Sequence, residues 1–328
     1  MMKRQNLLVF LVIASITLYH LYLSIHIIHI ITNIHNFLTN QAKQLAHQQS
    51  IMTSAINPIP IDSFTSDEID NLCDSSKKLK RNAKVLSYVV FGPRKMYYDG
   101  IPKVIKNARS MPLYKHWQIR IYHNGEIPIN IVKEYEREKD VYFCDGRNVP
   151  RYGDLSKILK SLWRLLPMTD PSVDVLCPRD LDSAIISREE DAVKEFLQSG
   201  MTIHMMRDHQ QHKETIMAGM WCFRTEYNRT LGRELLEAVL EKAKGYSRRI
   251  DQPIINTVIN GLMYRKYKLT KRLQHDSYWC GFYKGTKPFP TKREGNTFVG
   301  CPSHLCKAKI RECPVNCRPS YGKNWTYC

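Results

Sequence analysis

The sequence predicts an α/β protein: a mostly parallel sheet flanked by helices, preceded by an N-terminal transmembrane helix and followed by a cysteine-rich C-terminal tail. Three observations lead to this fold class. Between residues 82 and 290, short β-rich apolar runs alternate with segments of helical spacing, as in sheets covered on both faces. An uncharged, mostly apolar stretch fills residues 7–31. Six of the ten cysteines lie at or after position 280.

The N-terminal stretch predicts a membrane anchor. As a helix, residues 7–31 would reach about 37 Å, enough for a tilted bilayer span. The alternative is a cleaved signal peptide, but the stretch is too long for one and no Ala-x-Ala site follows it. Lys3 and Arg4 precede the span, so the positive-inside rule predicts a type II protein in the Golgi or ER membrane, with its catalytic part in the lumen.

The predicted domain organisation follows from shifts in composition. A polar segment that contains Asn57-Pro58-Ile59-Pro60 makes a poor core and a good tether, so we expect a stem before the globular part. The expected segments are a cytosolic tail at 1–6, the anchor at 7–31, the stem at 32–81, a catalytic domain at 82–290 and a disulfide-rich extension at 291–328.

Four strands are expected in the first half of the catalytic domain. Residues 85–91 are an apolar, β-rich run that ends at Gly92-Pro93, which predicts a buried strand followed by a loop. The other three strands are expected at 117–122, 141–144 and 173–177. Ligands of such sheets bind beyond the carboxyl ends of the strands, which directs attention to the residues that follow each run.

The expected helices have recognisable ends. Residues 155–166 have helical spacing and stop at Pro167. Ser187, with Glu190 three residues later, predicts a capping box. In chain order the later expectations are the end of that helix at Gly200, a helix at 231–244 ended by Gly245, and a helix capped by Asp251 with Pro253 in its first turn.

Composition limits the classes of protein. A hydrophobic share of 43% in 328 residues is typical of a globular chain with a sizeable core. The net charge of +18 raises the possibility of a nucleic-acid partner, but no nucleic-acid-binding motif is recognisable and the predicted anchor argues against one. We therefore expect no nucleic acid, and the basic excess is compatible with anionic donors or acidic glycan acceptors.

The cysteines agree with a lumenal location. Cys301-x4-Cys306 and Cys313-x3-Cys317 lack the two-residue spacing of zinc ribbons, so disulfides are favoured over zinc, with the pairing left open. Two glycosylation triplets begin at Asn228 and Asn324 and are compatible with the same compartment.

The sharpest functional feature follows the strand at 173–177. Asp180 and Asp182 are two residues apart, and an extended segment places such side chains on one side. Carboxylate oxygens suit a hard divalent cation, which can also grip a diphosphate, and Arg179 beside them is a candidate phosphate partner. About one such pair is expected by chance in a chain of average composition, so a solvated loop with a capping Asp is the alternative.

Further candidate groups lie downstream. Residues 204–209 (His-Met-Met-Arg-Asp-His) contain four polar side chains beside an apolar run, and residues 217–221 (Met-Ala-Gly-Met-Trp) place small residues next to Trp221. Glycine lets a bulky ligand approach the backbone, and an aromatic face suits a sugar ring. The structural alternatives are a core position for His204 and Trp221 and a capping role for Asp251.

In this order, the segments 179–183, 204–209, 217–221 and 251–256 resemble GT-A-type nucleotide-sugar glycosyltransferases. The Asp-Gln…Asn segment 251–256 is similar to an element of glycogenin-like enzymes, and Gly285-Thr286-Lys287-Pro288-Phe289 is similar to their Gly-x-x-Lys-Pro-Trp element. The resemblance covers residues 85–290. It departs from the family at Phe282, where a histidine is usual, and His275 is the expected substitute metal ligand.

The resemblance implies a metal-dependent transfer of a sugar, with Mn²⁺ or Mg²⁺ on the donor diphosphate. The donor is expected to be a nucleotide sugar, with UDP-sugars favoured, and the acceptor a glycan or glycoprotein. Metal ligands are expected at Asp180, Asp182 and His275, and a base at Asp251 or Asp208. Donor or acceptor contacts are expected at Tyr88, Phe91, Arg179, Arg207, Gly219, Trp221, Gln252 and Lys287.

Two other functions are compatible with the sequence. A non-catalytic, membrane-anchored binding protein would work through the cysteine-rich tail and would tolerate loss of both Asp180 and Asp182. A metal-dependent hydrolase would need a richer His/Asp ligand set at the strand ends than the sequence contains.

Overall fold

The computed structural model describes residues 32–35, 39, 72–73, 79–93, 95–246, 250–265, 271–283, 285–302, 306 and 309–328. The chain divides into two compact units, Met1–Ser66 and Asp67–Cys328. In the first unit, residues 32–35 are helical. The predicted anchor at 7–31 lies outside the described residues. Among the described residues, no helix is long and apolar enough to span a bilayer.

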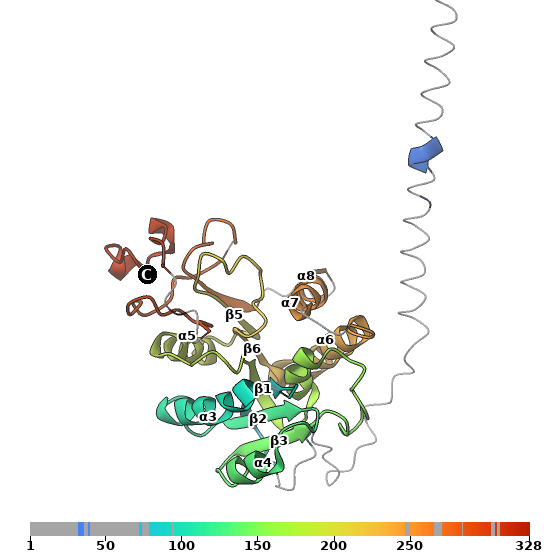
Figure 1. The fold of residues 1–328 in the computed structure, drawn as a ribbon. Coiled ribbons are helices and arrows are strands. Elements are labelled where there is room, and N and C mark those ends of the chain that lie inside the picture. Colours follow the sequence, from blue (N-terminus) through green and yellow to red (C-terminus); the bar gives the residue numbers. More distant parts are fainter. Residues whose placement is uncertain are drawn as a thin grey trace, which may run out of the picture. The chain divides into compact units, whose positions relative to one another are not determined.

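The second unit is built on a seven-stranded sheet with the order β3-β2-β1-β4-β6-β5-β7 (Figure 1). The strands are β1 (Ala83–Val90), β2 (Gln118–His123), β3 (Val141–Asp145), β4 (Val173–Pro178), β5 (Ile203–Arg207), β6 (Trp221–Arg224) and β7 (Arg272–Asp276). The first four are mutually parallel, β6 runs antiparallel to both β4 and β5, and β7 is parallel to β5. The expected α/β class and mostly parallel sheet are confirmed.

Helices cover both faces of this sheet, as the alternating pattern predicts. The α-helices are α2 (Lys95–Tyr98), α3 (Gly100–Ser110), α4 (Ile129–Tyr135), α5 (Ser187–Gln198), α6 (Arg229–Lys242), α7 (Asp251–Ile255) and α8 (Gly261–Arg265). One core joins the sheet to α3 and α5, and the other joins it to α6 and α7. Figure 1 shows these two groups on opposite sides of the strands.

The helix expected at 155–166 is instead a 3₁₀-helix, η2 (Lys160–Thr169), which contains Pro167. The residues before it are tied elsewhere: the Leu155 N–H donates to Gly146 O at 3.0 Å, and Ile158 forms a β-bridge with Lys244. These bonds hold residues 155–159 out of a helix. All seven residues from Leu162 to Met168 are buried, and Arg164 is the one charged residue among them.

Two predicted helix caps are absent. The residue before α5 is Ile186, and Glu190 accepts from the backbone N–H of Leu113 instead of closing a capping box. Helix α7 is preceded by Ile250, so Asp251 is its first residue and its carboxylate is not a cap. By contrast, Asn228 caps α6, because its Oδ1 accepts from Leu231 N at 2.8 Å.

The globular part begins before the predicted boundary at residue 82. Leu72 is fully buried, and its N–H donates to Asp170 Oδ2 at 3.1 Å. Cys73 forms a disulfide with Cys144 at the end of β3. Residues 72–73, expected in the stem, therefore belong to the packed unit.

All ten cysteines form disulfides, which confirms the prediction of disulfides in preference to zinc ligands. The pairs are Cys73–Cys144, Cys177–Cys222, Cys280–Cys317, Cys301–Cys306 and Cys313–Cys328. Cys177–Cys222 joins β4 to β6, directly before the Arg179-Asp180 segment.

Candidate functional site

The candidate site lies where β4 ends. Asp180 follows this strand by two residues, and its side chain is 46% exposed. Arg164, from η2, donates through Nη1 to Asp180 Oδ1 and through Nη2 to Asp251 Oδ2, the latter at 3.0 Å. The Arg164 side chain is only 4% exposed. One buried guanidinium thus bridges two carboxylates whose positions in the sequence are far apart.

This bridge sets the charge state of Asp180. Burial opposes ionisation, but the positive charge and hydrogen bond of Arg164 outweigh it and hold the pKa of Asp180 below its usual value. The carboxylate is therefore anionic at neutral pH, as a metal ligand must be. Sequence reasoning missed Arg164, because an arginine in an apolar helical run carries no local signal of its partners.

Gly219 makes room for Asp180. A Cβ built on Gly219 would lie 2.2 Å from Asp180 Oδ2, closer than real Cβ atoms approach oxygen. A side chain at position 219 would therefore displace the Asp180 carboxylate from its present position. Gly219 O in turn accepts from Arg179 Nη1 at 3.2 Å.

Helix α7 fixes the loop that carries Gly219. Gln252 Oε1 accepts from Ala218 N at 2.9 Å, while Gln252 Nε2 donates to Ile216 O at 2.5 Å. Asn256 adds two bonds to the same residue: its Oδ1 accepts from Ile216 N at 3.1 Å, and its Nδ2 donates to Ile216 O at 2.9 Å. In this structure the Asp-Gln…Asn segment therefore holds a loop in place, and Asp251 is its member beside Asp180.

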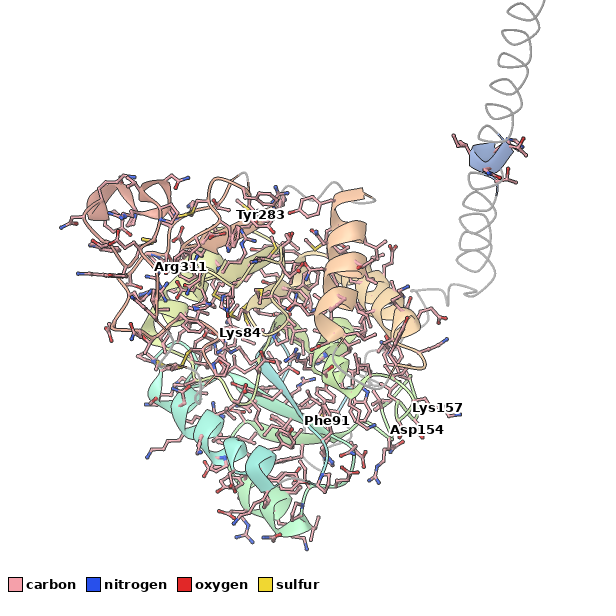
Figure 2. The ribbon with its side chains drawn as sticks, turned by 45° about the horizontal axis from the view of Figure 1, so that its top comes forward. Lys84, Phe91, Asp154, Lys157, Tyr283 and Arg311 are labelled. Carbon is pink, nitrogen blue, oxygen red and sulfur yellow. A yellow bond between two sulfur atoms is a disulfide. The ribbon has the colours of Figure 1, made fainter. Side chains whose placement is uncertain are left out.

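A cleft of about 930 Å³ opens at the carboxyl ends of β1 and β2. Its lining includes Phe91, Tyr152, Tyr246 and three lysines, Lys157, Lys160 and Lys244. Figure 2 shows Phe91, Asp154 and Lys157 close together at one side of the molecule. Lys160 begins η2, which also carries Arg164, and four residues of a 3₁₀-helix span about 8 Å. The cleft and the Asp180 group are therefore neighbours.

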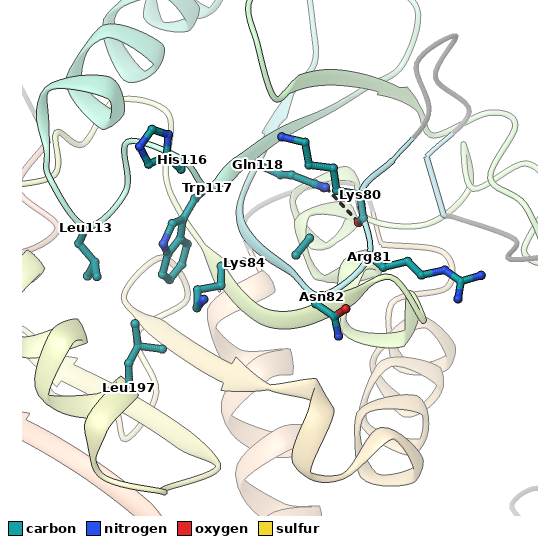
Figure 3. A pocket seen from close by; sticks show the side chains of 10 residues that line it. Lys80, Arg81, Asn82, Lys84, Leu113, His116, Trp117, Gln118 and Leu197 are labelled. Carbon is teal, nitrogen blue, oxygen red and sulfur yellow. Dashed lines mark hydrogen bonds between the residues drawn. The ribbon is translucent and has the colours of Figure 1, made fainter.

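A smaller recess of about 410 Å³ lies at the opposite ends of the same strands (Figure 3). It is lined by residues 80–84 at the start of β1 and by residues that precede β2, and it contains none of the expected site residues.

Arg179 is buried and paired inside the protein. Its side chain is 1% exposed, and Nη1 lies 2.8 Å from Glu189 Oε1 of α5. Tyr88 and Tyr114 are also fully buried beside this pair. Four groups of the cluster contain buried atoms without a hydrogen-bond partner in the described structure: Tyr88 Oη, Tyr114 Oη, Arg179 Nε and Nη2, and Glu189 Oε2. Arg179 is not available to a phosphate, nor Tyr88 to a nucleobase, so these two expectations are corrected.

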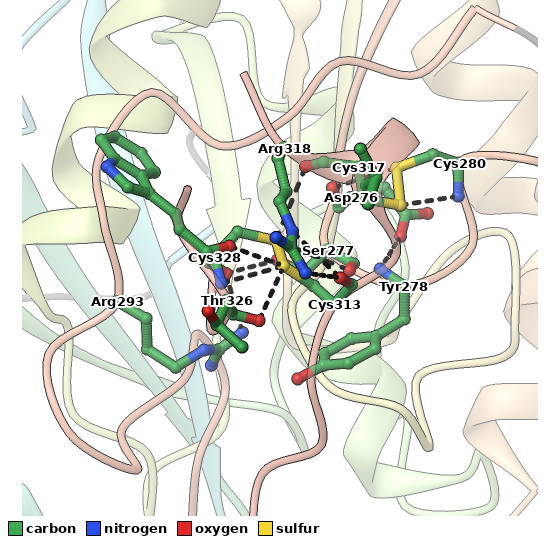
Figure 4. The surroundings of a disulfide bond; sticks show 12 residues. Asp276, Ser277, Tyr278, Cys280, Arg293, Cys313, Cys317, Arg318, Thr326 and Cys328 are labelled. Atoms are coloured by element: carbon green, nitrogen blue, oxygen red, sulfur yellow. Dashed lines mark hydrogen bonds between the residues drawn. A yellow bond between two sulfur atoms is a disulfide. The ribbon is translucent and has the colours of Figure 1, made fainter. Parts of the chain in front are cut away.

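Asp208 is the centre of a buried ionic group. Figure 4, which shows the surroundings of a disulfide, includes three of the residues bonded within this group, Ser277, Arg293 and Cys328. Its carboxylate accepts from Arg188 Nε at 3.0 Å, Arg293 Nη2 at 2.6 Å, Ser277 Oγ at 2.6 Å and Val299 N at 3.0 Å. Both arginines also bond to Cys328 O. With no exposed surface, Asp208 has no route to a substrate proton, and we assign it a structural role in holding the C-terminal extension.

Arg207 and His275 are likewise buried and bonded. Arg207 Nε lies 2.6 Å from Asp276 Oδ2, and its guanidinium stacks on Tyr283 at 3.9 Å. Both ring nitrogens of His275 are engaged, one with His204 Nε2 at 2.8 Å and the other with Glu195 Oε2 at 3.1 Å. His275 therefore has no nitrogen free for a metal in this structure.

Of the remaining residues expected in the site, one is buried in the core and the others reach the surface. Trp221 is 1% exposed and donates through Nε1 to Ala218 O, so it is a core residue, not a sugar platform. Lys287 is 60% exposed and pairs with Glu195 Oε1 at 2.9 Å. Phe91 lines the cleft, and Asp182 is exposed beside Asp180.

The donor chemistry at Asp180 and Asp182 fits a hard divalent cation. Carboxylate oxygens are the ligands that Mg²⁺ and Mn²⁺ prefer, and Gly219 leaves Asp180 Oδ2 unobstructed by a side chain. Within the described residues, one group of three potential ligands lies close together: Asp276, Cys280 and Cys317. Its two sulfur atoms are joined in a disulfide, so that group is not a metal site.

Comparisons with known proteins give distant structural likeness only. No family model matches the chain, and no curated protein matches its sequence. A protein from Bacillus anthracis, described as a glucose-1-phosphate thymidylyltransferase and solved with sucrose, is 12% identical, with a TM-score of 0.37. The match covers 59% of this chain and 86% of that one. A 4-diphosphocytidyl-2C-methyl-D-erythritol synthase from Anaerococcus prevotii is 9% identical over 58% and 89% of the two chains, with a TM-score of 0.33.

Proposed function

We propose that this protein is a metal-dependent glycosyltransferase that moves a sugar from a nucleotide-sugar donor to a glycan or glycoprotein acceptor. A UDP-sugar is the first candidate for the donor. The observation that carries the proposal is the group formed by Asp180, Arg164, Asp251 and Gly219 at the end of β4, beside the lysine-lined cleft. Carboxyl ends of parallel strands are where α/β sheets bind ligands.

In this proposal Asp180 and Asp182 hold Mn²⁺ or Mg²⁺, which would neutralise charge on the leaving diphosphate. Arg164 keeps Asp180 ionised and aimed, so that little reorganisation is needed when a donor binds. The cleft lysines Lys157, Lys160 and Lys244 take the phosphate role expected of Arg179. Phe91 supplies a ring at the cleft for a nucleobase.

Asp251 is the carboxylate proposed to face the reacting sugar. Its side chain is 22% exposed, and one of its oxygens is held by Arg164. A carboxylate within reach of the acceptor hydroxyl can accept its proton. We propose further that the chain is a type II protein of the Golgi or ER membrane, which rests on the sequence of residues 1–31 and on the five disulfides.

The test is calorimetric titration of the full chain with UDP- and GDP-sugars, with and without Mn²⁺. We expect metal-dependent binding of one nucleotide sugar, its loss in Asp180→Asn, and its retention in Asp191→Asn, a matched change on α5. The absence of metal-dependent binding to every nucleotide sugar tested would refute the proposal. Unchanged binding by Asp180→Asn would place the metal elsewhere.

A further inference from the structure

The recess at the amino ends of β1 and β2 is remote from the candidate active site. It has a volume of about 410 Å³, within the range of small-ligand pockets. Asp180 follows the carboxyl end of β4, which is parallel to β1. Because β1 has eight residues, the recess lies roughly 26 Å from the catalytic edge. The lining residues are Lys80, Arg81, Asn82, Ala83, Lys84, Leu113, His116, Trp117, Gln118 and Leu197.

Lys84 is the unusual feature of this recess. It is the one exposed position of β1, although that strand lies inside the sheet between β2 and β4. The register of β1 against β4 shifts between Ala83 and Lys84, and such bulges re-aim side chains. Figure 3 shows the Lys84 side chain beside Trp117 and Leu197. Among the described residues, no hydrogen bond or ion pair to the Lys84 side chain is found.

The charge of the recess is positive. Three of its lining side chains are cationic, Lys80, Arg81 and Lys84, and none is a carboxylate. Two acids outside the lining are bonded to lining residues: Asp140 Oδ1 lies 2.6 Å from Lys80 Nζ, and Asp174 Oδ2 accepts from Asn82 Nδ2 at 3.1 Å. The carbonyl oxygens of the loop before β2 face Arg109, which donates to Lys115 O at 3.1 Å and to Trp117 O at 3.0 Å. A further cation thus neutralises the backbone dipoles beneath the recess.

The floor of the recess is apolar and sunken. Trp117 is 5% exposed, and Leu113 and Leu197 are partly buried beside it. None of the large apolar side chains that are exposed among the described residues lies in this lining. A membrane surface would need apolar side chains that project from the rim, whereas a hollow with an apolar floor and cationic side chains at its rim fits a single ring that bears an acidic group.

We propose that this recess is a second, non-catalytic binding site for a sulfated or phosphorylated sugar ring of an acidic glycan. Lys84 and His116 contact the acidic group, and the partly buried side chains of Leu113 and Leu197 pack against the ring. The net charge of +18, which the catalytic site does not explain, raises the local concentration of such glycans.

A sulfated heparin disaccharide, titrated into the full chain without metal or nucleotide, tests this site. We expect binding that weakens as salt is raised, and that weakens about tenfold or more in Lys84→Glu because a charge-assisted contact is lost. Lys133→Glu, an equal charge reversal at an exposed position of α4, should bind like the wild type. Lys84→Met removes the charge but keeps most of the length of the side chain. It serves as a second variant in case Lys84→Glu disturbs folding, and we expect the same loss of binding.

Three results would overturn the proposal. One is equal affinity of the wild type and both Lys84 variants for the disaccharide, which would show that Lys84 is solvent-exposed and does not contact the ligand. Another is the absence of binding both to the disaccharide and to phosphoinositide vesicles. The third is adsorption to phosphoinositide vesicles without disaccharide binding. Asp180→Asn should bind the disaccharide normally, so a failure of this site and a failure of the proposed transferase function give different results.

Discussion

At the scale of single residues, the contact between Gly219 and Asp180 is the tightest requirement in the candidate site. A methyl group at position 219 would meet Asp180 Oδ2 at 2.2 Å, so Gly219→Ala must displace the carboxylate. We expect metal-dependent donor binding to weaken by about tenfold or more, a cost above about 1.4 kcal/mol, with the fold retained. Titration calorimetry and circular dichroism measure the two effects.

The matched control is Gly281→Ala. A Cβ there would meet only the side-chain amide of Asn316, at 3.3 Å, which can shift. Donor binding that survives Gly219→Ala unchanged would show that Asp180 is not a donor-site ligand.

Glu189 should make stability depend on pH. Burial raises the pKa of Glu189 to about 7, from a usual value of 4.5, against the opposing effect of Arg179. Between these values the folded state binds the proton more tightly than the unfolded state, so the free energy of unfolding falls as pH rises, by about 1.4 kcal/mol per pH unit. We expect the wild type to lose about 3 kcal/mol between pH 4.5 and 7.5 relative to Glu189→Gln, which cannot ionise.

Urea unfolding at a series of pH values measures this difference. Asp191→Asn, on the same helix, serves as the control and should follow the wild-type profile. Parallel profiles for the wild type and Glu189→Gln would mean that Glu189 titrates alike in both states.

At the scale of elements, α7 is a clamp for the loop at 216–219. Gln252→Ala removes the two hydrogen bonds that Gln252 makes to Ile216 and Ala218. Each neutral bond contributes about 1 kcal/mol, so we expect amide exchange in the loop to rise about tenfold or more while β1 to β4 stay protected. Hydrogen–deuterium exchange with mass spectrometry shows this directly.

Thr257→Ala is the control for the clamp, because Thr257 is exposed on the continuation of the same helix. Equal exchange in Gln252→Ala, Thr257→Ala and the wild type would contradict the clamp.

The elements that sequence reasoning predicted are those with local signals. Residues 85–91 and 173–177 are apolar runs with turn residues after them, and β1 and β4 lie there. Strand β6 has only four residues, and it is specified by antiparallel pairing with β4 and β5. Such pairing depends on residues far away in the chain, so no local pattern at 221–224 indicates it.

The same limit explains the errors within the site. Asp208 and Arg207 are charged residues near an apolar run, and charge alone suggested a ligand-binding role. Two of their partners, Arg293 and Asp276, lie 85 and 69 positions later in the sequence. Asp180, Gly219 and Asp251 could be proposed from sequence because their residue types have known chemical uses, and the structure places them together. Arg164 becomes a candidate only when the fold brings it between two carboxylates.

At the scale of the whole molecule, the five disulfides differ in the length of chain that they close. Cys73–Cys144 spans 71 residues and Cys301–Cys306 spans five. On chain-entropy grounds, removal of the first costs about 4 kcal/mol and removal of the second about 2 kcal/mol. We expect Cys73→Ser with Cys144→Ser to lower the urea midpoint more than Cys301→Ser with Cys306→Ser.

Each double variant leaves no free thiol from its own pair, so exchange with the other disulfides does not confuse the comparison. A larger loss from the Cys301–Cys306 pair would show that the short loop acts through packing of the C-terminal extension near Ser183, which pairs with Pro302.

The bond between Cys73 and Cys144 also has a mechanical consequence. Any pull that arrives along the chain from before residue 72 reaches a covalent link to β3 first. The load then passes into the sheet through β3, and the hydrogen bonds at the start of β1 are shielded from it. Under oxidising conditions such a pull leaves the hydrogen bonds of β1 intact, whereas reduction would let the same pull peel β1 from its neighbours.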